Sequence, residues 1–244
     1  MKATFSPSAA LAGRTLFVLG GTGFLGKVYV SMLLERFPEI ARVYLMVRST
    51  ADSGARFRDV ILPSPAFDPL RARQGEGLEA FLARKLVVVG GDIAEENLGL
   101  PEDEAARIAE DVDVIVNCAG LVVFNPPLES ALKTNVTGIR NVLAFAHRLK
   151  RPALVHVSTC YVAGNRSGPR REDEPVVGAF PRRGADGADA FDLEAEIRGC
   201  ERLVARVRED AHEPALVVGF RRAARARLLE EARDPDDDKA LRLG

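Results

Sequence analysis

Residues 15–27 read TLFVLGGTGFLGK and bring four glycines close together, Gly20, Gly21, Gly23 and Gly26. A turn without side chains lets backbone N–H groups approach a bound phosphate closely. A helix that begins at such a turn adds a partial positive charge, which favours an anion. The stretch therefore predicts a site for the pyrophosphate of a dinucleotide.

The residues on either side of the glycines predict the elements that such a site needs. The apolar run Thr15–Leu19 predicts a strand, and apolar residues at steps of three and four from Val28 to Phe37 predict a helix. Strand, glycine turn and helix in this order are the expected context of a dinucleotide site. The alternative is a glycine-rich turn that binds nothing. The residues expected to contact the cofactor here are Gly20, Thr22, Gly23, Phe24, Leu25 and Gly26.

An arginine ends the next predicted strand, residues 42–48, which read RVYLMVR. Arg48 lies about 20 positions after Gly26, where an acidic residue would bind the ribose 2′-hydroxyl of NAD and an arginine accommodates the 2′-phosphate of NADP. Arg48 therefore predicts NADPH rather than NADH, with Ser49 and Thr50 as further hydroxyl contacts. The alternative is an exposed arginine without a ligand.

Two further strands are predicted over residues 85–89, KLVVV, and 112–118, VDVIVNC. Asp92 follows the first of these and is, on residue type alone, a turn aspartate that caps what comes next. Ala119 and Gly120 follow the second. Small residues at that position let the strand end pass close to a nicotinamide ribose, and they equally suit tight packing of a strand against a helix.

A fifth strand is predicted over residues 153–158, ALVHVS, and the predicted elements alternate strand and helix along the chain. This order is typical of the α/β class with a doubly wound parallel sheet, the Rossmann arrangement, with right-handed crossovers. Ligands of such sheets bind outside the carboxyl ends of the strands. The candidate residues follow predicted strands, so they are expected to meet at one edge of the sheet.

Composition narrows the possible functions. The chain has 244 residues, 47% of them hydrophobic, and a formal net charge of −1. A strongly basic surface for nucleic acid is therefore not expected. The cysteines Cys118, Cys160 and Cys200 are far apart, which predicts reduced thiols in a cytoplasmic protein rather than disulfides or a metal site. Apolar runs stay well short of the ~20 residues of a membrane span, so no transmembrane segment is expected.

The chain is expected to have four parts: a loose leader over residues 1–13, an NADP-binding domain over 14–168, a loop over 169–190, and a truncated helical insertion or extension over 191–244. Inside the second part, residues 51–84 predict a long connection with a short helix near Leu78–Leu82.

The last part is predicted to contain two helices. Apolar residues at helical spacing from Leu193 to Val207 predict an amphipathic helix, and a second, charged helix is predicted over residues 220–233. The apolar stripe of the first helix must be buried against something. We expect this to be a substrate domain or a partner subunit missing from this chain.

The pieces GGTGFLGK, GDI, NCAGLVVF, KTNVTGIRNVL and VHVSTCYVAG together resemble the extended short-chain dehydrogenase/reductases. They resemble in particular the fatty acyl-CoA reductases and the related thioester-reductase domains, the male sterility family. The most specific part is V-V-F-N-x-P-L-x-x-A-L-x-x-N-V-x-G, from Val122 to Gly138, and the resemblance covers Thr15–Gly164. It implies NADPH-dependent reduction of a fatty acyl thioester, such as an acyl-CoA, to an aldehyde or alcohol.

The resemblance also implies roles for individual residues. Asp92, with Ile93, would contact the adenine ring. Thr159 would polarise the substrate carbonyl, with Ser158 as the second candidate. Asn135 would support the proton relay, the alternative being an exposed asparagine on a helix.

One departure from the family pattern concerns the proton donor, a tyrosine four residues before a lysine. The tyrosines of this chain are Tyr29, Tyr44 and Tyr161, and none has a lysine four positions later. Tyr161 is interpreted as a packing residue. Without the pair, hydride transfer lacks its acid, so this chain by itself is expected to be inactive.

Two kinds of alternative remain open. The same fold could act on a nucleotide sugar or a sterol as a reductase or epimerase. A non-enzyme alternative is an NADPH-sensing domain that reports cofactor binding to a partner.

Overall fold

The computed structural model describes residues 6–48, 52–163, 168–169, 171–174 and 192–231. The chain divides into two compact units, residues 1–160 and 161–244.

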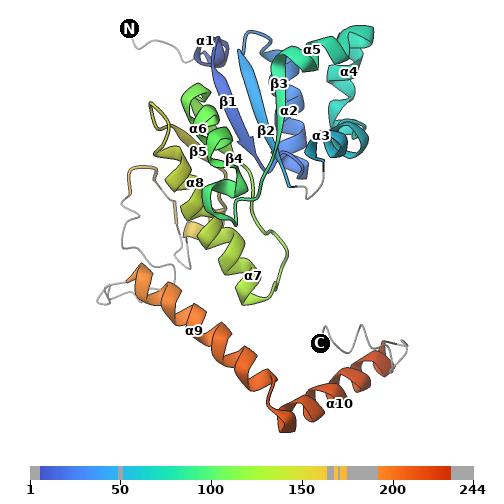
Figure 1. Ribbon diagram of the computed structural model, residues 1–244, viewed down its shortest axis with the longest axis vertical. Helices are drawn as coiled ribbons and strands as arrows, with labels where there is room; N and C mark the ends of the chain where they lie inside the picture. The colour runs from blue at the N-terminus through green and yellow to red at the C-terminus, as the bar shows by residue number, and fades with distance from the viewer. Residues whose placement is uncertain (1–5, 49–51, 164–167, 170, 175–191, 232–244) are drawn as a thin grey trace. The chain divides into compact units, whose positions relative to one another are not determined.

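The first unit contains a five-stranded parallel sheet in the order β3-β2-β1-β4-β5 (Figure 1). In register, Phe17 of β1 pairs with Tyr44 of β2 on one side and with Ile115 of β4 on the other. The direction of strand addition reverses at β1, which makes the boundary between β1 and β4 the switch point of a doubly wound sheet. The predicted fold class is confirmed. The strands are β1 Thr15–Leu19, β2 Arg42–Val47, β3 Leu86–Gly90, β4 Val114–Asn117 and β5 Leu154–His156.

Helical segments connect the strands of this unit. They are α1 Pro7–Leu11, α2 Phe24–Arg36, α3 Ser53–Arg56, the π-helical turn η1 Phe57–Ile61, η2 Pro65–Phe67, α4 Asp68–Gln74, η3 Gly75–Gly77, α5 Leu78–Lys85, η4 Glu96–Gly99, α6 Glu102–Asp111, α7 Leu128–Leu132, the π-helical turn η5 Lys133–Thr137, α8 Gly138–Ala146 and η6 Cys160–Ala163, which runs across the boundary between the units.

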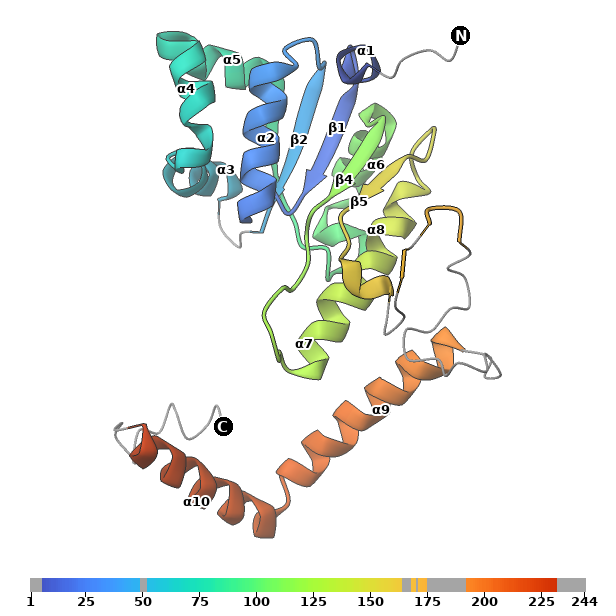
Figure 2. The same ribbon diagram turned by 180° about the vertical axis from the view of Figure 1, so that it is seen from behind.

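The sheet is covered by helices on both faces, α2 and α4 on one and α6 and α8 on the other (Figures 1 and 2). Successive side chains of a strand point to opposite faces. Accordingly, Leu16 and Val18 of β1 pack with α2, whereas Phe17 and Leu19 pack with α6 and α8. A strand buried on both faces is a continuous apolar run, which is why TLFVL was recognisable as a strand.

The predicted long connection over residues 51–84 is instead largely helical. The described part of it, from residue 52 on, forms α3, η1, η2, α4, η3 and α5. Phe57, Phe67 and Phe81 are buried and belong to the core on the α2 face. Prolines and glycines break the segment into short pieces, which hid the helical periodicity. The predicted short helix near Leu78 is confirmed as the first part of α5.

The predicted loose leader also contains structure. Residues 7–11 form α1, whose first turn is capped by Ser6, because the Ala9 N–H donates to Ser6 Oγ at 3.4 Å. Leu11 packs against the core on the α2 face. Residues 1–5 lie outside the described part of the chain.

The second unit contains α9, Leu193–Ala211, and α10, Pro214–Glu230. The predicted amphipathic helix is confirmed, and Asp192 caps it by accepting from the Ala195 N–H at 2.9 Å. The second helix begins at Pro214 rather than at Phe220, since proline is well tolerated in the first turn of a helix.

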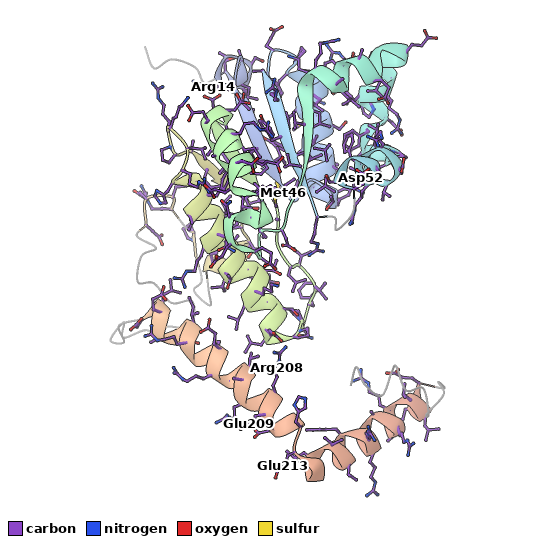
Figure 3. All side chains as sticks on the ribbon, in the orientation of Figure 1. Arg14, Met46, Asp52, Arg208, Glu209 and Glu213 are labelled. Carbon is purple, nitrogen blue, oxygen red and sulfur yellow. The ribbon has the colours of Figure 1, made fainter. Side chains whose placement is uncertain are left out.

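Figure 3 shows side chains projecting around both helices of this unit. The apolar side chains at the two ends of the stripe, Leu193 and Val207, are exposed. Among the described residues, none of the helices has the length and apolar character needed to cross a membrane. Most of the predicted loop over 169–190 and the end of the chain from residue 232 lie outside the described residues.

The ring of Phe17 provides a test of the core. Phe17 is fully buried, and its ring centroid lies 5.7 Å from that of Phe145 and 6.4 Å from that of Tyr44. Phe17→Ala should lower the free energy of unfolding by about 3–5 kcal/mol, because it removes a large buried side chain and leaves a cavity. Denaturant unfolding followed by circular dichroism measures the change. The exposed Val60 is the control: Val60→Ala should stay within about 0.5 kcal/mol of wild type, and equal losses at the two positions would contradict this description of the core.

Candidate functional site

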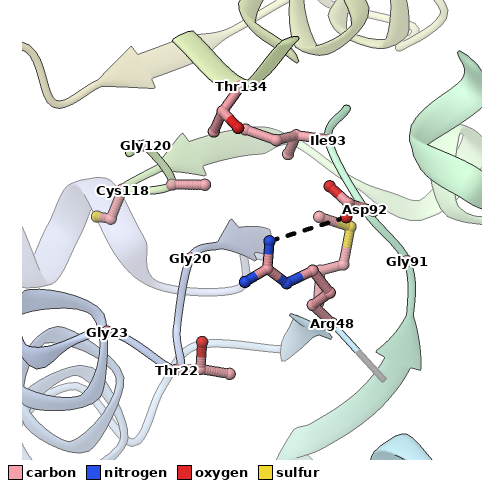
Figure 4. A pocket seen from close by; sticks show the side chains of 12 residues that line it. Gly20, Thr22, Gly23, Arg48, Gly91, Asp92, Ile93, Cys118, Gly120 and Thr134 are labelled. Atoms are coloured by element: carbon pink, nitrogen blue, oxygen red, sulfur yellow. Dashed lines mark ion pairs between the residues drawn. The ribbon is translucent and has the colours of Figure 1, made fainter. Parts of the chain in front are cut away.

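A cavity of about 170 Å³ opens at the carboxyl edge of the sheet, at the switch point between β1 and β4 (Figure 4). Its lining comes from the segments that follow β1, β3 and β4, from the end of β2 and from η5. The residues are Gly20, Thr22, Gly23, Met46, Arg48, Gly91, Asp92, Ile93, Cys118, Ala119, Gly120 and Thr134. The expected convergence of strand ends is therefore present in the structure.

Most of the residues predicted to contact a cofactor line this cavity. They are Gly20, Thr22, Gly23, Arg48, Asp92, Ile93, Ala119 and Gly120. Phe24, Leu25 and Gly26 do not: the first two are exposed at the start of α2, and Gly26 is buried beneath the turn. Met46, Gly91 and Thr134 also line the cavity and were not predicted to do so, and Cys118 was predicted only to be a reduced thiol. Met46 lies close to the carboxyl end of β2, and ligands of such sheets bind outside the carboxyl ends of the strands, so its position could have indicated it.

Two of the glycines are required by the shape of the turn itself. Gly20 has φ +79°, and a methyl group there would lie 2.4 Å from the backbone nitrogen of Ala119. A methyl group on Gly26 would lie 2.2 Å from the carbonyl oxygen of Gly20. Both approaches are far too short for a side chain, so these glycines bring β4 and α2 against the turn.

Gly23 differs from Gly20 and Gly26. A methyl group on Gly23 would meet its nearest neighbour, the Gly20 carbonyl oxygen, at 3.4 Å, which is an ordinary contact. Packing therefore does not demand glycine at this position. Because Gly23 lines the cavity, a ligand that approaches the backbone closely is the simplest reason for it.

The N-terminus of α2 lies at the cavity and has no acidic residue in its first turn. Its N-cap is Gly23, which has no side chain to cap the first turn, and that turn holds no acidic residue. The unpaired N–H groups of a helix start carry partial positive charge. Lys27 adds a full charge nearby in sequence. The start of α2 can therefore attract a phosphate.

Arg48 extends from the end of β2 across the cavity towards Asp92 (Figure 4). The distance from Arg48 Nη1 to Asp92 Oδ2 is 4.0 Å, and the arginine side chain is 77% exposed. An exposed pair at that distance contributes little, so the guanidinium stays available for a ligand. The Arg48 carbonyl accepts from Arg56 Nη1 at 2.6 Å, which holds the strand end. Ser49 and Thr50, the predicted additional contacts, lie outside the described residues.

Asp92 forms a turn after β3. Its Oδ1 accepts from the Ala94 N–H at 2.9 Å, and its own N–H donates to the Leu98 carbonyl at 2.9 Å. The turn-capping alternative is therefore correct for Oδ1. Contact with an adenine ring stays a prediction that concerns Asp92 Oδ2 and the neighbouring Ile93.

Asn135 lies in η5, where the helical segment of residues 128–146 widens into a π-helical turn. Its amide bonds both backbone groups of one residue in the loop after β4: the Leu121 N–H donates to Asn135 Oδ1 at 2.7 Å, and Asn135 Nδ2 donates to the Leu121 carbonyl at 3.0 Å. Asn135 is exposed on the surface of this helical segment, as the alternative expected, and its amide is also bonded to the backbone of the loop. Asn135 anchors this loop, and its part in a proton relay stays a prediction.

Asn141 of α8 makes a similar pair of bonds on the other side of the site. Its Nδ2 donates to the carbonyls of Ile93 at 2.8 Å and Glu95 at 3.0 Å. Ile93 also lies against Gly138 at the start of α8, where a methyl group would meet its side chain at 3.0 Å. One continuous helical segment, residues 128–146, thus holds the loops after β3 and β4.

Ser158 and Thr159, the predicted carbonyl-binding residues, follow β5 and are exposed. They lie at the carboxyl end of the sheet, as expected, but neither lines the cavity. Their catalytic roles stay predictions. The expectation that Tyr161 packs into the structure is wrong, since its side chain is 75% exposed.

Burial shapes the behaviour of two side chains at the end of β4, Asn117 and Cys118. Burial raises the pKa of the Cys118 thiol, so this cysteine stays protonated near neutral pH. Asn117 is fully buried, and its Oδ1 accepts from the Ala119 N–H at 2.9 Å, which orients the backbone at the cavity. Its Nδ2 lies 3.1 Å from His156 Nδ1 on β5.

A parallel sheet in this order, with a glycine turn at the switch point and an arginine after the second strand, defines a dinucleotide-binding domain of the Rossmann type. Comparison with known families gives a more specific result. Residues 18–216 match the family described as "Male sterility protein", and the chain belongs to this NAD(P)-binding family.

Individual relatives agree with this assignment. The chain is 35% identical over 161 residues to fatty acyl-CoA reductase 2, chloroplastic, of Arabidopsis thaliana, a match that covers 65% of this chain and 26% of the relative. The terminal R domain of the myxalamid PKS-NRPS biosynthetic pathway is 37% identical with a TM-score of 0.54, covering 67% of this chain and 39% of that one. The reductase domain of a nonribosomal peptide synthetase from Mycobacterium tuberculosis is 27% identical with a TM-score of 0.54, covering 77% and 45%.

The match covers only part of these relatives. This chain spans 26% of the length of fatty acyl-CoA reductase 2, and 39% and 45% of the two reductase domains.

The different roles of Gly23 and Gly26 can be separated by two matched substitutions. Gly23→Ala should lower the free energy of unfolding by no more than about 1 kcal/mol, the loss expected when alanine replaces glycine at an N-cap, and weaken NADPH binding about tenfold or more, because the methyl group blocks close approach of the pyrophosphate. Gly26→Ala should destabilise the fold by at least about 2 kcal/mol, because the methyl group meets rigid backbone; this exceeds the ~1 kcal/mol that alanine gains over glycine inside a helix.

Denaturant unfolding and fluorescence titration with NADPH measure both quantities for each variant. Unchanged NADPH affinity in a folded Gly23→Ala protein would show that the cavity does not hold the cofactor at this turn.

Proposed function

We propose that this chain is the NADPH-binding part of a reductase that acts on fatty acyl thioesters such as acyl-CoA. In the whole protein, the product would be an aldehyde or an alcohol. One observation carries the proposal: the cavity joins a glycine turn, an exposed arginine and the small residues after β4 at the switch point of the sheet. Membership of a family with fatty acyl-CoA reductases among its relatives supports the substrate class.

The cofactor would lie across the switch point. Gly20, Gly23 and the start of α2 would take the pyrophosphate. Arg48 and Asp92 would face the adenosine half, on the β2 and β3 side. Ala119 and Gly120 would face the nicotinamide half, on the β4 side, where their small size leaves room for the ribose.

Arg48 supports the choice of NADPH over NADH. Its guanidinium is permanently charged and largely exposed, and the 4.0 Å pair with Asp92 is too weak to neutralise it. A 2′-phosphate on the ribose would supply the partner that this side chain lacks in NADH.

The reaction would transfer a hydride from NADPH to the thioester carbonyl carbon. Thr159, with Ser158 as second candidate, would donate a hydrogen bond to the carbonyl oxygen, and Asn135 would support the proton relay through the loop that it anchors. None of the three tyrosines has a lysine four positions later, so the family pattern assigns the proton to a group outside this chain. Tyr44 is buried and donates to Asp111 Oδ2 at 2.9 Å, and burial, with the nearby Cys118 thiol, raises the pKa of Tyr29.

The exposure of β5 supports a role within a larger protein. Val155 is 54% exposed and Val157 just beyond the strand is 43% exposed, whereas strands of doubly wound sheets are normally covered on both faces. We propose that a substrate domain or partner subunit covers this strand.

We also propose that residues 14–168 form the NADP-binding domain and that the helices of residues 191–244 are an insertion or extension. The three unpaired thiols support a cytoplasmic location.

The cofactor preference gives a direct test. The wild-type chain should bind NADPH more tightly than NADH, and Arg48→Asp should weaken NADPH binding by about tenfold or more while leaving NADH binding nearly unchanged, because the substitution replaces the phosphate partner with a like charge. Fluorescence titration of both cofactors measures the ratio, with circular dichroism as the check on folding. Arg36→Asp, at an exposed arginine outside the cavity lining, is the control. Equal affinity of the wild-type chain for both cofactors would refute the assignment of Arg48.

The missing acid gives a second test. The 244-residue chain should show no palmitoyl-CoA-dependent oxidation of NADPH, because a general acid contributes on the order of 10²–10⁴ to the rate. A longer protein that contains this chain and a tyrosine four residues before a lysine should show it, and Thr159→Ala in that protein should lower kcat. Activity of the longer protein towards nucleotide sugars but not acyl-CoA would replace the proposed substrate class.

A further inference from the structure

The loop between β4 and α7 exposes large apolar side chains in succession. Val122 is 86% exposed, Val123 63%, Phe124 84% and Leu128 41%. The sequence from 118 to 128, CAGLVVFNPPL, contains no charged residue. Contiguous exposed apolar side chains of this kind usually mark a surface that binds something.

This loop is anchored at both ends, so its apolar side chains are presented by a defined backbone. At its start, Asn135 bonds both backbone groups of Leu121. At its end, Pro126 and the N-cap Pro127 restrict the backbone as it enters α7. Asn125 between them has φ +54°, a left-handed turn that directs the chain back towards the helix. The side chains from Val122 to Phe124 are thereby held away from the core.

The loop begins where the cavity ends. Gly120, immediately before it, lines the cavity, and so does Thr134, the neighbour of the anchoring Asn135. Figure 4 shows Gly120 and Thr134 on the opposite side of the cavity from Thr22, with Arg48 reaching in from the end of β2. In the proposed binding mode the β4 side holds the nicotinamide, so a ligand that lies on this loop would have one end beside the reacting ring.

We infer that the 121–128 loop is the surface on which the acyl chain of the substrate lies, an inference that rests on the proposed function. An acyl chain is apolar and uncharged, as the loop is. A membrane surface is a poorer match, because segments that bind membranes combine apolar residues with several lysines or arginines. The nearest basic side chain in the following helix, Lys133, is paired with Glu95 at 2.9 Å.

The experiment compares long and short acyl chains on matched variants. Binding of palmitoyl-CoA and butyryl-CoA to the NADPH-saturated chain is measured by calorimetry below the micelle concentration. The variant Val123→Ser/Phe124→Ser should bind palmitoyl-CoA about tenfold more weakly or worse, the order expected when apolar surface of this size is lost. Butyryl-CoA and NADPH should bind to it as they do to wild type. Val60→Ser is the control, because Val60 is 64% exposed, close to the 63% of Val123, but lies on η1.

The outcomes separate the inference from the proposed function. Equal binding of palmitoyl-CoA by wild type and by Val123→Ser/Phe124→Ser would overturn the inference and leave the proposed function standing. No binding of any acyl-CoA to a chain that binds NADPH would overturn the proposed substrate and the inference with it. Loss of self-association or of binding to phosphatidylcholine vesicles in the double variant, without a change for palmitoyl-CoA, would assign the loop to a second copy or to a membrane instead.

Discussion

The backbone of Gly20 lies against the backbone of Ala119, and most of the site depends on that approach. A methyl group on Gly20 would lie 2.4 Å from the Ala119 nitrogen, so no other residue fits without moving one of the two strands. β1 leads into the glycine turn and β4 leads into the 121–128 loop. The spacing between the two halves of the cavity is therefore set by a contact between two main chains, with no side chain to adjust it.

The helical segment from residue 128 to 146 stabilises this arrangement from outside the sheet. Asn135 bonds the loop after β4, Asn141 bonds the loop after β3, and Phe145 of the same segment packs against Phe17 in the core. The π-helical turn at residues 133–137 changes the direction in which side chains leave the helix. Because of this turn, a single helix can reach two loops that leave the sheet on different sides of β1.

Much of the fold was predictable because strands buried on both faces leave a strong apolar pattern, as at Thr15–Leu19. The cavity lining was predictable for a related reason: strand ends of a doubly wound sheet meet at one edge, so Arg48, Asp92 and Ala119 could be grouped without knowing any distance. Apart from the short helix near Leu78, the helices within residues 52–85 were not predictable, because their prolines and glycines divide them into pieces shorter than a recognisable period. The role of Asn135 was also hidden, since a π-helical turn has no simple sequence signal and the bond partner Leu121 contributes only backbone atoms.

The side chain of Asn117 links the cavity to the edge strand β5 through two hydrogen bonds, one to Ala119 and one to His156. Its Oδ1 is occupied by the Ala119 N–H, so its Nδ2 must be the atom that faces His156 Nδ1. That ring nitrogen then has to be an acceptor, which leaves the imidazole hydrogen on Nε2 when the ring is neutral. Donors and acceptors thus run in one order from the peptide at the cavity, through a buried amide, to a histidine on the outermost strand.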